Sequence, residues 1–177
     1  IITKSDLVLR DIDLLKQISK VYAAISFTIT TADDDLAKII EPAAPLPSSR
    51  FEALKTLNEN GIYCGITLMP ILPFINDSSE QIENLLNRAI ESGVKYIIPF
   101  MGLTLREGSR DYFYSRLDKS FPGMKEKYEK RFGISYVCNS PNANSLYQMI
   151  DSKLAEYNIS KKMEFYKPDL PEQLRLF

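Results

Sequence analysis

The chain has 177 residues, with 22 Lys and Arg against 23 Asp and Glu, and it contains no histidine. This length suits one domain with one hydrophobic core, and a net charge of −1 gives no general reason to expect nucleic acid as a partner. Without histidine, Ser-His-Asp and Cys-His nucleophilic sites, HExxH zinc sites and imidazole acid–base catalysis are all excluded.

Alternating apolar and amphipathic segments follow one another along the first hundred residues. Short apolar runs rich in β-branched and aromatic residues predict buried parallel strands, and segments with an apolar stripe predict helices between them. The expected strands are residues 1–3, 21–30, 62–72 and 94–101, and the expected helices are residues 11–20, 33–40, 50–60 and 79–92. Gly61 and Gly93 are expected just past the ends of two of these helices.

This alternation predicts an α/β fold with a parallel sheet and right-handed crossovers, either open and doubly wound or closed toward a (β/α) barrel. In both arrangements, functional residues gather at the carboxyl ends of the strands. Residues 1–102 form the repeating part, 103–158 a more charged α/β extension with a strand at 134–138 and a helix at 144–157, and 159–177 an extended tail.

Cysteine usage and the ends of the chain bear on where the protein works. Cys64 and Cys138 are far apart and form no CxxC grouping, which argues for a reducing compartment and against a metal cluster on this chain alone. No apolar run could cross a membrane and nothing resembles a signal peptide, so we expect a cytoplasmic protein with no membrane partner. The chain opens on IITKSD without an initiator Met, and we expect it to be part of a longer protein.

The segment EPAAPLPSSRFEAL, residues 41–54, contains three prolines that exclude a helix interior between Glu41 and Ser48. Ser49 and Glu52 have the spacing of a capping box, which predicts that a helix begins there with Arg50 in its first turn. A cation is unfavourable at that end of a helix, so Arg50 is expected to have an anionic partner. Glu41 is the candidate, because it brackets the proline segment from the other side.

Four of these segments together resemble the radical S-adenosylmethionine enzymes of the spore photoproduct lyase and "DNA repair photolyase" group. The matching stretches are TKSDLVLRDIDLL, AISFTITT, IIEPAAPLPSSRFEAL and GITLMPILPFIND, which cover roughly the first 105 residues in the family's order. The resemblance implies the later strands of a partial (β/α)6 TIM-like barrel with a C-terminal extension. It also implies an iron-sulfur enzyme of DNA repair, with S-adenosylmethionine and a 4Fe-4S cluster as cofactors of the intact protein.

The family's cluster loop, a CxxxCxxC motif, is not present in this sequence and is expected upstream of it. In the family, the cluster supplies the electron that cleaves S-adenosylmethionine, and the resulting radical abstracts hydrogen from a substrate, with damaged DNA as the candidate here. We therefore expect no catalytic residue, no metal and no bound cofactor in this chain by itself, which should be inactive alone.

Carried over by position, the resemblance implies three contacts to S-adenosylmethionine. Lys4 meets its carboxylate, Ser26 provides a hydroxyl ligand, and Met69 lies where the family places backbone against the adenine. The alternatives are a solvated lysine at a strand end for Lys4 and a small core residue for Ser26. Arg50 either pairs with Glu41 and fixes the proline segment, or acts directly at the cofactor carboxylate or a substrate phosphate.

Residues 103–132 carry a local excess of positive charge and several interleaved aromatic residues. A basic surface with stacking rings would suit nucleic acid, whereas an amphipathic pair of helices would use the same rings as core and the charges as solvent face.

A non-catalytic interaction module on a half-barrel that has lost the cluster is the alternative function. An unrelated flavodoxin-like or Rossmann-like domain is disfavoured because no Gly-rich phosphate loop follows a strand. The exposed edge of the first strand predicts a covering element or a homodimer contact.

The last residues, PEQLRLF, fit the QLxLF pentapeptide with which bacterial DNA polymerases and repair proteins dock on the sliding clamp. In such a motif Leu174, Leu176 and Phe177 supply the apolar part. Leu176 and Phe177 fill an apolar pocket of the clamp, and Gln173 makes polar contacts at the rim of that pocket. The alternative is that these apolar residues pack back on the barrel.

Overall fold

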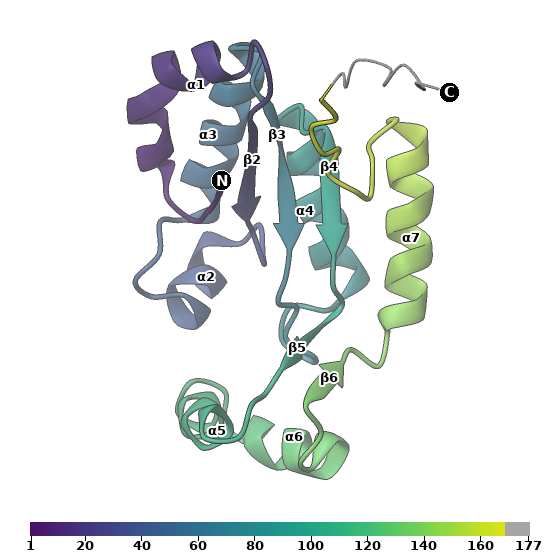
Figure 1. Cartoon of the computed structure of the whole chain (residues 1–177). Helices are drawn as coiled ribbons and strands as arrows, with labels where there is room; N and C mark the ends of the chain where they lie inside the picture. Colours follow the sequence, from purple (N-terminus) through teal and green to yellow (C-terminus); the bar gives the residue numbers. More distant parts are fainter. Residues whose placement is uncertain (169–177) are drawn as a thin grey trace, which may run out of the picture.

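The computed structural model describes residues 1–168 and shows an α/β protein with a smaller α/β extension (Figure 1). The first part contains strands β1 (Ile2–Thr3), β2 (Ala24–Thr28), β3 (Tyr63–Leu68) and β4 (Tyr96–Pro99), the 3-10 helix η1 (Asp6–Asp11), and helices α1 (Ile12–Ile18), α2 (Asp34–Ile40), α3 (Pro47–Glu59) and α4 (Ser79–Glu91). The extension contains β5 (Gly102–Thr104), α5 (Ser109–Ser120), α6 (Met124–Phe132) and β6 (Val137–Asn139), and α7 (Ala143–Glu156) follows it.

The four strands β1 to β4 form one parallel sheet in the order β1-β2-β3-β4. Each strand therefore lies beside the strand that precedes it in the chain, and helices provide the crossovers between them. The predicted α/β class and parallel sheet are confirmed. The expected strands are too long, because apolar residues such as Ile71 remain buried after the strand pairing has ended.

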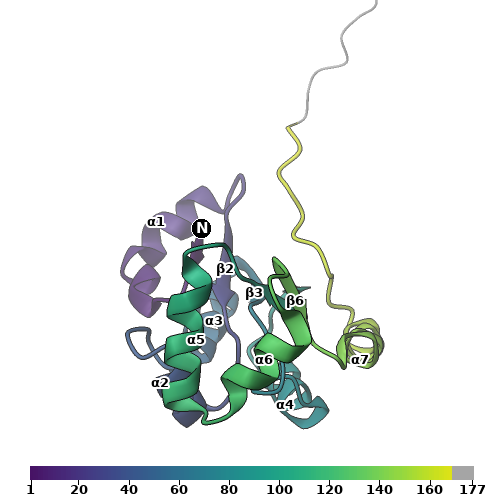
Figure 2. The same cartoon turned by 90° about the horizontal axis from the view of Figure 1, so that it is seen from below.

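The two faces of the sheet differ in chemistry because successive side chains of a strand point to opposite sides. Ile25 and Phe27 of β2 belong to the main hydrophobic cluster, together with Leu54 of α3 and Leu85 of α4. Figures 1 and 2 show α3 and α4 on this side of the sheet. The other face carries Ser26, Thr28, Thr67 and Tyr96, whose hydroxyl groups bond to one another in pairs.

The C-terminal segment of the described chain crosses the polar face near the amino-terminal ends of the strands. Ser160 bonds to the backbone of Lys95 and Ile97 at the edge of β4. Farther on, the backbone N–H of Glu164 donates to the Tyr63 hydroxyl at 3.0 Å, and the Tyr22 hydroxyl donates to the Glu164 carbonyl. This end of the described chain therefore lies away from the carboxyl ends of the strands (Figure 1).

The extension has its own small core beyond the carboxyl ends of the strands. Strands β5 and β6 pair antiparallel, and a second hydrophobic cluster joins α5 to α6. The aromatic residues Tyr114 and Tyr128 are buried in this cluster, with Phe113, Phe121 and Phe132 half-buried against it. These rings are core, whereas Tyr112 is 70% exposed and is free to contact a ligand.

Local signals in the sequence differ in how well they place the helix ends. Gly61 and Gly93 both have positive φ, 72° and 73°, as expected of residues that follow a helix. The predicted capping box at Ser49 is wrong, because α3 begins at Pro47 with Leu46 as its N-cap. Proline suits the first helical position, since its φ is already helical and its missing N–H would have no helical partner.

Two further expectations concern the outside of the molecule. β1 is the edge strand of the sheet, and Ile1 and Ile2 are 65% and 72% exposed. Within residues 1–168 no strand covers its outer edge, and a homodimer contact there stays a prediction. Among the same residues, no helix has both the length and the apolar character needed to cross a membrane.

Candidate functional site

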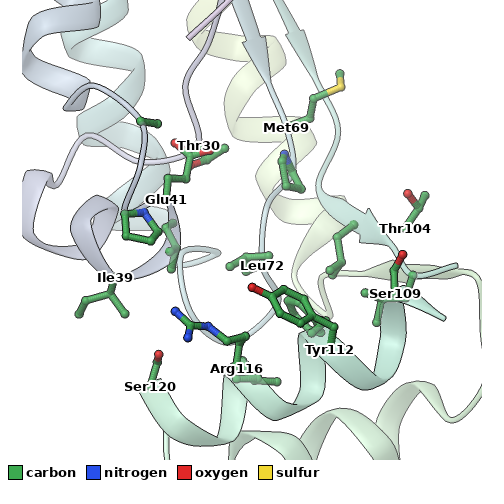
Figure 3. Close-up of a pocket in the computed structure, with 18 of the residues that line it drawn as sticks. Thr30, Ile39, Glu41, Met69, Leu72, Thr104, Ser109, Tyr112, Arg116 and Ser120 are labelled. Atoms are coloured by element: carbon green, nitrogen blue, oxygen red, sulfur yellow. The ribbon is translucent and has the colours of Figure 1, made fainter. Parts of the chain in front are cut away.

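A cleft of about 870 Å³ opens where the parallel strands end (Figure 3). Lys4 follows β1, Thr30 follows β2, Met69 and Pro70 follow β3, and Phe100 follows β4. Helix α5 of the extension forms the opposite wall. The cleft thus lies between the repeating α/β part and the extension, at the edge of the sheet where the sequence predicts functional residues.

The loop after β3 forms the floor of the cleft and is held by two buried polar side chains. Asn76 donates to the Thr30 carbonyl at 2.7 Å and accepts from the Leu72 N–H at 2.6 Å. Asp77 accepts from the Phe74 N–H at 2.8 Å and from the Ser140 hydroxyl at 2.6 Å. These bonds connect the loop to β2 and to the start of α7, which makes the floor a fixed surface.

Helix α6 supports the same loop from beneath. The Tyr128 hydroxyl donates to the Pro73 carbonyl at 2.8 Å, and burial strongly raises the pKa of this tyrosine. Sequence reasoning missed Asn76, Asp77 and Tyr128. The available signal was the polar pair Asn76 and Asp77 directly after an apolar stretch at a strand end, since such a pair needs partners when it is buried.

On one wall of the cleft, Lys4, Glu41 and Arg50 form a chain of ion pairs. The Lys4 ammonium donates to Glu41 Oε1 at 2.7 Å, and Arg50 Nη2 donates to Glu41 Oε2 at 2.8 Å. Arg50 is fully buried, and its remaining donors reach the carbonyls of Thr28 and Pro45, each at 2.8 Å. The predicted pairing of Arg50 with Glu41 across the proline segment is confirmed.

The candidate residues for S-adenosylmethionine, three from the resemblance and Arg50 from the proline segment, divide into two pairs. Lys4 and Met69 both line the cleft. Arg50 lies behind its wall and reaches it only through Glu41. Ser26 lies deeper, in the middle of β2, where it is 2% exposed and its hydroxyl bonds with the Tyr96 hydroxyl at 2.6 Å. The structure therefore brings Lys4 and Met69 together and places Ser26 elsewhere on the polar face.

Helix α5 contributes a polar and aromatic rim to the cleft. Tyr112 and Arg116 project from this helix toward the floor around Leu72 (Figure 3). Ser109 and Ser120 lie near the two ends of the same helix and also line the cleft. Of the basic and aromatic residues predicted from this segment, Tyr112 and Arg116 are the pair that the fold exposes at the cleft.

The clamp-like motif formed by Gln173, Leu174, Leu176 and Phe177 lies outside the described residues. Two cysteines are described, and each is buried in a different hydrophobic cluster, Cys64 of β3 in the main cluster and Cys138 of β6 in that of the extension. No group of three or more His, Cys, Asp or Glu side chains within residues 1–168 has the arrangement of a metal site. The residues described do not fit a 4Fe-4S cluster.

The buried thiol of Cys64 gives a pH prediction. Burial raises its pKa to about 11, whereas a thiol in the unfolded chain titrates near 8.5. The stability that it contributes is present below about pH 8.5 and is lost as the pH rises through about 11, because the unfolded chain loses the proton first. We expect the melting temperature to fall over this interval, and to fall less in Cys64→Ala. Equal slopes in the two proteins would contradict this.

Comparisons with known proteins identify relatives without a described activity. An uncharacterized protein of Methanocaldococcus jannaschii is 37% identical over 140 residues, which are 79% of this chain and 52% of that protein. An uncharacterized protein of Mycobacterium tuberculosis is 24% identical over 173 residues, which are 97% of this chain and 50% of that protein. The chain thus spans about half the length of these relatives. No family model matches the chain, and no solved structure gives a significant match.

Proposed function

We propose that this chain forms part of a radical S-adenosylmethionine enzyme similar to the spore photoproduct lyase group, and that its cleft binds S-adenosylmethionine. The observation that carries this proposal is the position of Lys4 and Met69 at one cleft, on the ends of β1 and β3. The sequence resemblance had assigned both residues to the same cofactor. The flexible Lys4 ammonium would recognise the carboxylate of the ligand. The backbone at Met69, beside an apolar side chain, would recognise its adenine.

A partial (β/α)6 barrel is the architecture that goes with this proposal. The sheet order β1-β2-β3-β4 has no reversal, whereas a doubly wound sheet reverses its order at the point where ligands bind. The polar face of the sheet would then be the barrel interior, and the face covered by α3 and α4 its outside. The hydroxyl groups of Thr28 and Thr67, 2.9 Å apart, suit a partly wet interior of this kind.

The cleft fits S-adenosylmethionine in size and charge. Its volume of about 870 Å³ lies within the range of about 300–1,000 Å³ found for small-molecule sites. The Lys4–Glu41–Arg50 chain has two cations and one anion, so this wall has a net positive charge that attracts a carboxylate.

Damaged DNA is the substrate class that we propose for the intact protein. Tyr112 and Arg116 support it, because an exposed ring and a guanidinium on the wall opposite Lys4 suit a base and a phosphate. Both project from α5, so a substrate bound there would face the site proposed for S-adenosylmethionine across the cleft.

Calorimetric titration of this chain with S-adenosylmethionine tests the proposal. We expect measurable binding that weakens about tenfold or more in Lys4→Ala, because the carboxylate loses its cation. Lys16→Ala is the matched control, since Lys16 is an exposed lysine of α1 that does not line the cleft. No binding, or equal losses in the two variants, would contradict the proposal. Independently, the coding sequence upstream of residue 1 is expected to contain a CxxxCxxC motif.

The second candidate function is an interaction module that docks on the sliding clamp through the QLxLF motif. The course of the segment before it favours this candidate, because Ser160 and Glu164 hold the chain at the end of the sheet opposite the cleft. A labelled EQLRLF peptide is expected to bind purified clamp with a Kd near the micromolar range. Binding should disappear in the Gln173→Ala and Phe177→Ala peptides, and failure to compete with a known clamp ligand would rule the interaction out.

A further inference from the structure

The carboxylate of Glu41 is shared between two cations that come from distant parts of the chain. One oxygen accepts from Lys4 at 2.7 Å and the other from Arg50 at 2.8 Å. Glu41 follows the last residue of α2, while Lys4 follows β1 and Arg50 belongs to α3. The side chain of Glu41 is 11% exposed and that of Arg50 is fully buried, so the pair between them is shielded from water, whereas the pair with Lys4 lies at the surface of the cleft.

Arg50 is the fixed member of this group. Its side chain has no exposed surface, and two of its donors hold the carbonyls of Thr28, at the end of β2, and Pro45, in the proline segment. A guanidinium remains charged at every accessible pH and presents its donors in a rigid plane. Glu41 is therefore attached to an immobile cation, and the position of its second oxygen is set by Arg50.

Lys4 and Glu41 both line the cleft, and Lys4 is the more exposed of the two. Its side chain is 44% exposed and lines the cleft, and Glu41 is its one hydrogen-bond partner within residues 1–168. An ammonium has three N–H donors, so two remain for a ligand. A lysine side chain free in water would lose substantial rotamer freedom on binding, and the bond to Glu41 has already removed part of that freedom.

We propose that Glu41, held by Arg50, is a positioning residue that fixes the Lys4 ammonium at the cleft wall for the carboxylate of a bound ligand. This rests on the proposed function for the identity of the ligand, S-adenosylmethionine, but the positioning itself does not. Lys4 contacts the ligand, Glu41 acts through Lys4, and Arg50 acts through Glu41. Two cations and one carboxylate leave this group with one net positive charge, which favours a ligand with a single carboxylate at this point.

The positioning is tested without a ligand by NMR of the lysine ammonium groups, with Lys4 assigned through Lys4→Arg. In the wild-type chain, the Lys4 ammonium is expected to be more ordered than that of Lys16, which is exposed on α1. In Glu41→Gln, which keeps the size of the side chain and one oxygen acceptor, Lys4 should become as mobile as Lys16. A Lys4 signal that is already mobile in the wild type, or unchanged in the folded variant, would overturn the proposal.

The effect on ligands is tested with two probes that differ in the carboxylate. S-adenosylhomocysteine has it and 5′-methylthioadenosine does not. Glu41→Gln should weaken the binding of S-adenosylhomocysteine by about tenfold and leave the affinity for 5′-methylthioadenosine within about twofold of the wild-type value. A general loss of structure would not produce this difference. In a Lys4→Met background, Glu41→Gln should have no further effect on S-adenosylhomocysteine, since its route to the ligand is already broken. Equal losses for both probes would overturn the proposal.

The two experiments separate the failure of the positioning from the failure of the proposed function. If neither probe binds the wild-type chain while Lys4 is ordered and is released by Glu41→Gln, the assignment of S-adenosylmethionine is wrong and the positioning of Lys4 is supported. If both probes bind and neither responds to Glu41→Gln, the cleft is a nucleoside site and the positioning is overturned.

Discussion

Arg50→Ala is expected to lower the free energy of unfolding by about 3–5 kcal/mol, the largest effect of any single charge in the described chain. The change leaves a cavity and removes the donors to the Thr28 and Pro45 carbonyls, in addition to the ion pair with Glu41. The free energy of unfolding of a native protein is about 5–15 kcal/mol in total, so this loss is a large part of it. The melting temperature should therefore fall by about 10 °C, which differential scanning calorimetry would measure.

The matched control is Arg10→Ala, because Arg10 also pairs with a carboxylate but does so at the surface. The Arg10 and Asp11 side chains are 77% and 50% exposed. Exposed pairs stabilise little, so the melting temperature of this variant should stay close to that of the wild type. If Arg50→Ala also left it unchanged while affinity for S-adenosylmethionine collapsed, the guanidinium would be a direct ligand instead of a structural one.

The sequence predicts the elements of this fold better than it predicts their ends. Apolar runs located all four parallel strands, but hydrophobicity reports burial and not strand pairing. β3 ends at Leu68, although Ile71 beyond it is fully buried in the main hydrophobic cluster. Likewise, Ser49 and Glu52 have the correct spacing for a capping box, but Pro47 starts the helix two residues before Ser49.

The sequence predicts which residues lie at the cleft where each of them directly follows a strand. It does not predict the contacts between residues that are far apart in the chain. Lys4 and Met69 each follow a strand, so the topology alone brings them to one edge. The pairing of Lys4 with Glu41 joins residues 37 positions apart, and that of Ser26 with Tyr96 joins residues 70 apart. No local pattern encodes such contacts, because they depend on the register of the sheet and on the path of the proline segment.

The contact between Ser26 and Tyr96 depends on Gly65, which lies between them in the sheet register. A Cβ at residue 65 would lie 2.5 and 2.6 Å from two carbons of the Tyr96 ring and would also clash with the Tyr96 carbonyl oxygen. The ring can cover the sheet here because glycine has no side chain. Its hydroxyl then reaches Ser26, and burial raises the pKa of Tyr96 to about 12.

Gly65→Ala is therefore expected to destabilise the protein by about 3 kcal/mol or more, at the upper end of the range for overpacked cores. Chemical denaturation monitored by circular dichroism would measure this loss. Gly61→Ala is the comparison, because Gly61 has a φ of 72° and no atom within 4 Å of an added Cβ, so only backbone strain of about 1–2 kcal/mol applies. Tyr96→Ala should not restore Gly65→Ala, since the clash with the backbone carbonyl remains. Full rescue by Tyr96→Ala would show instead that the ring alone requires glycine at this position.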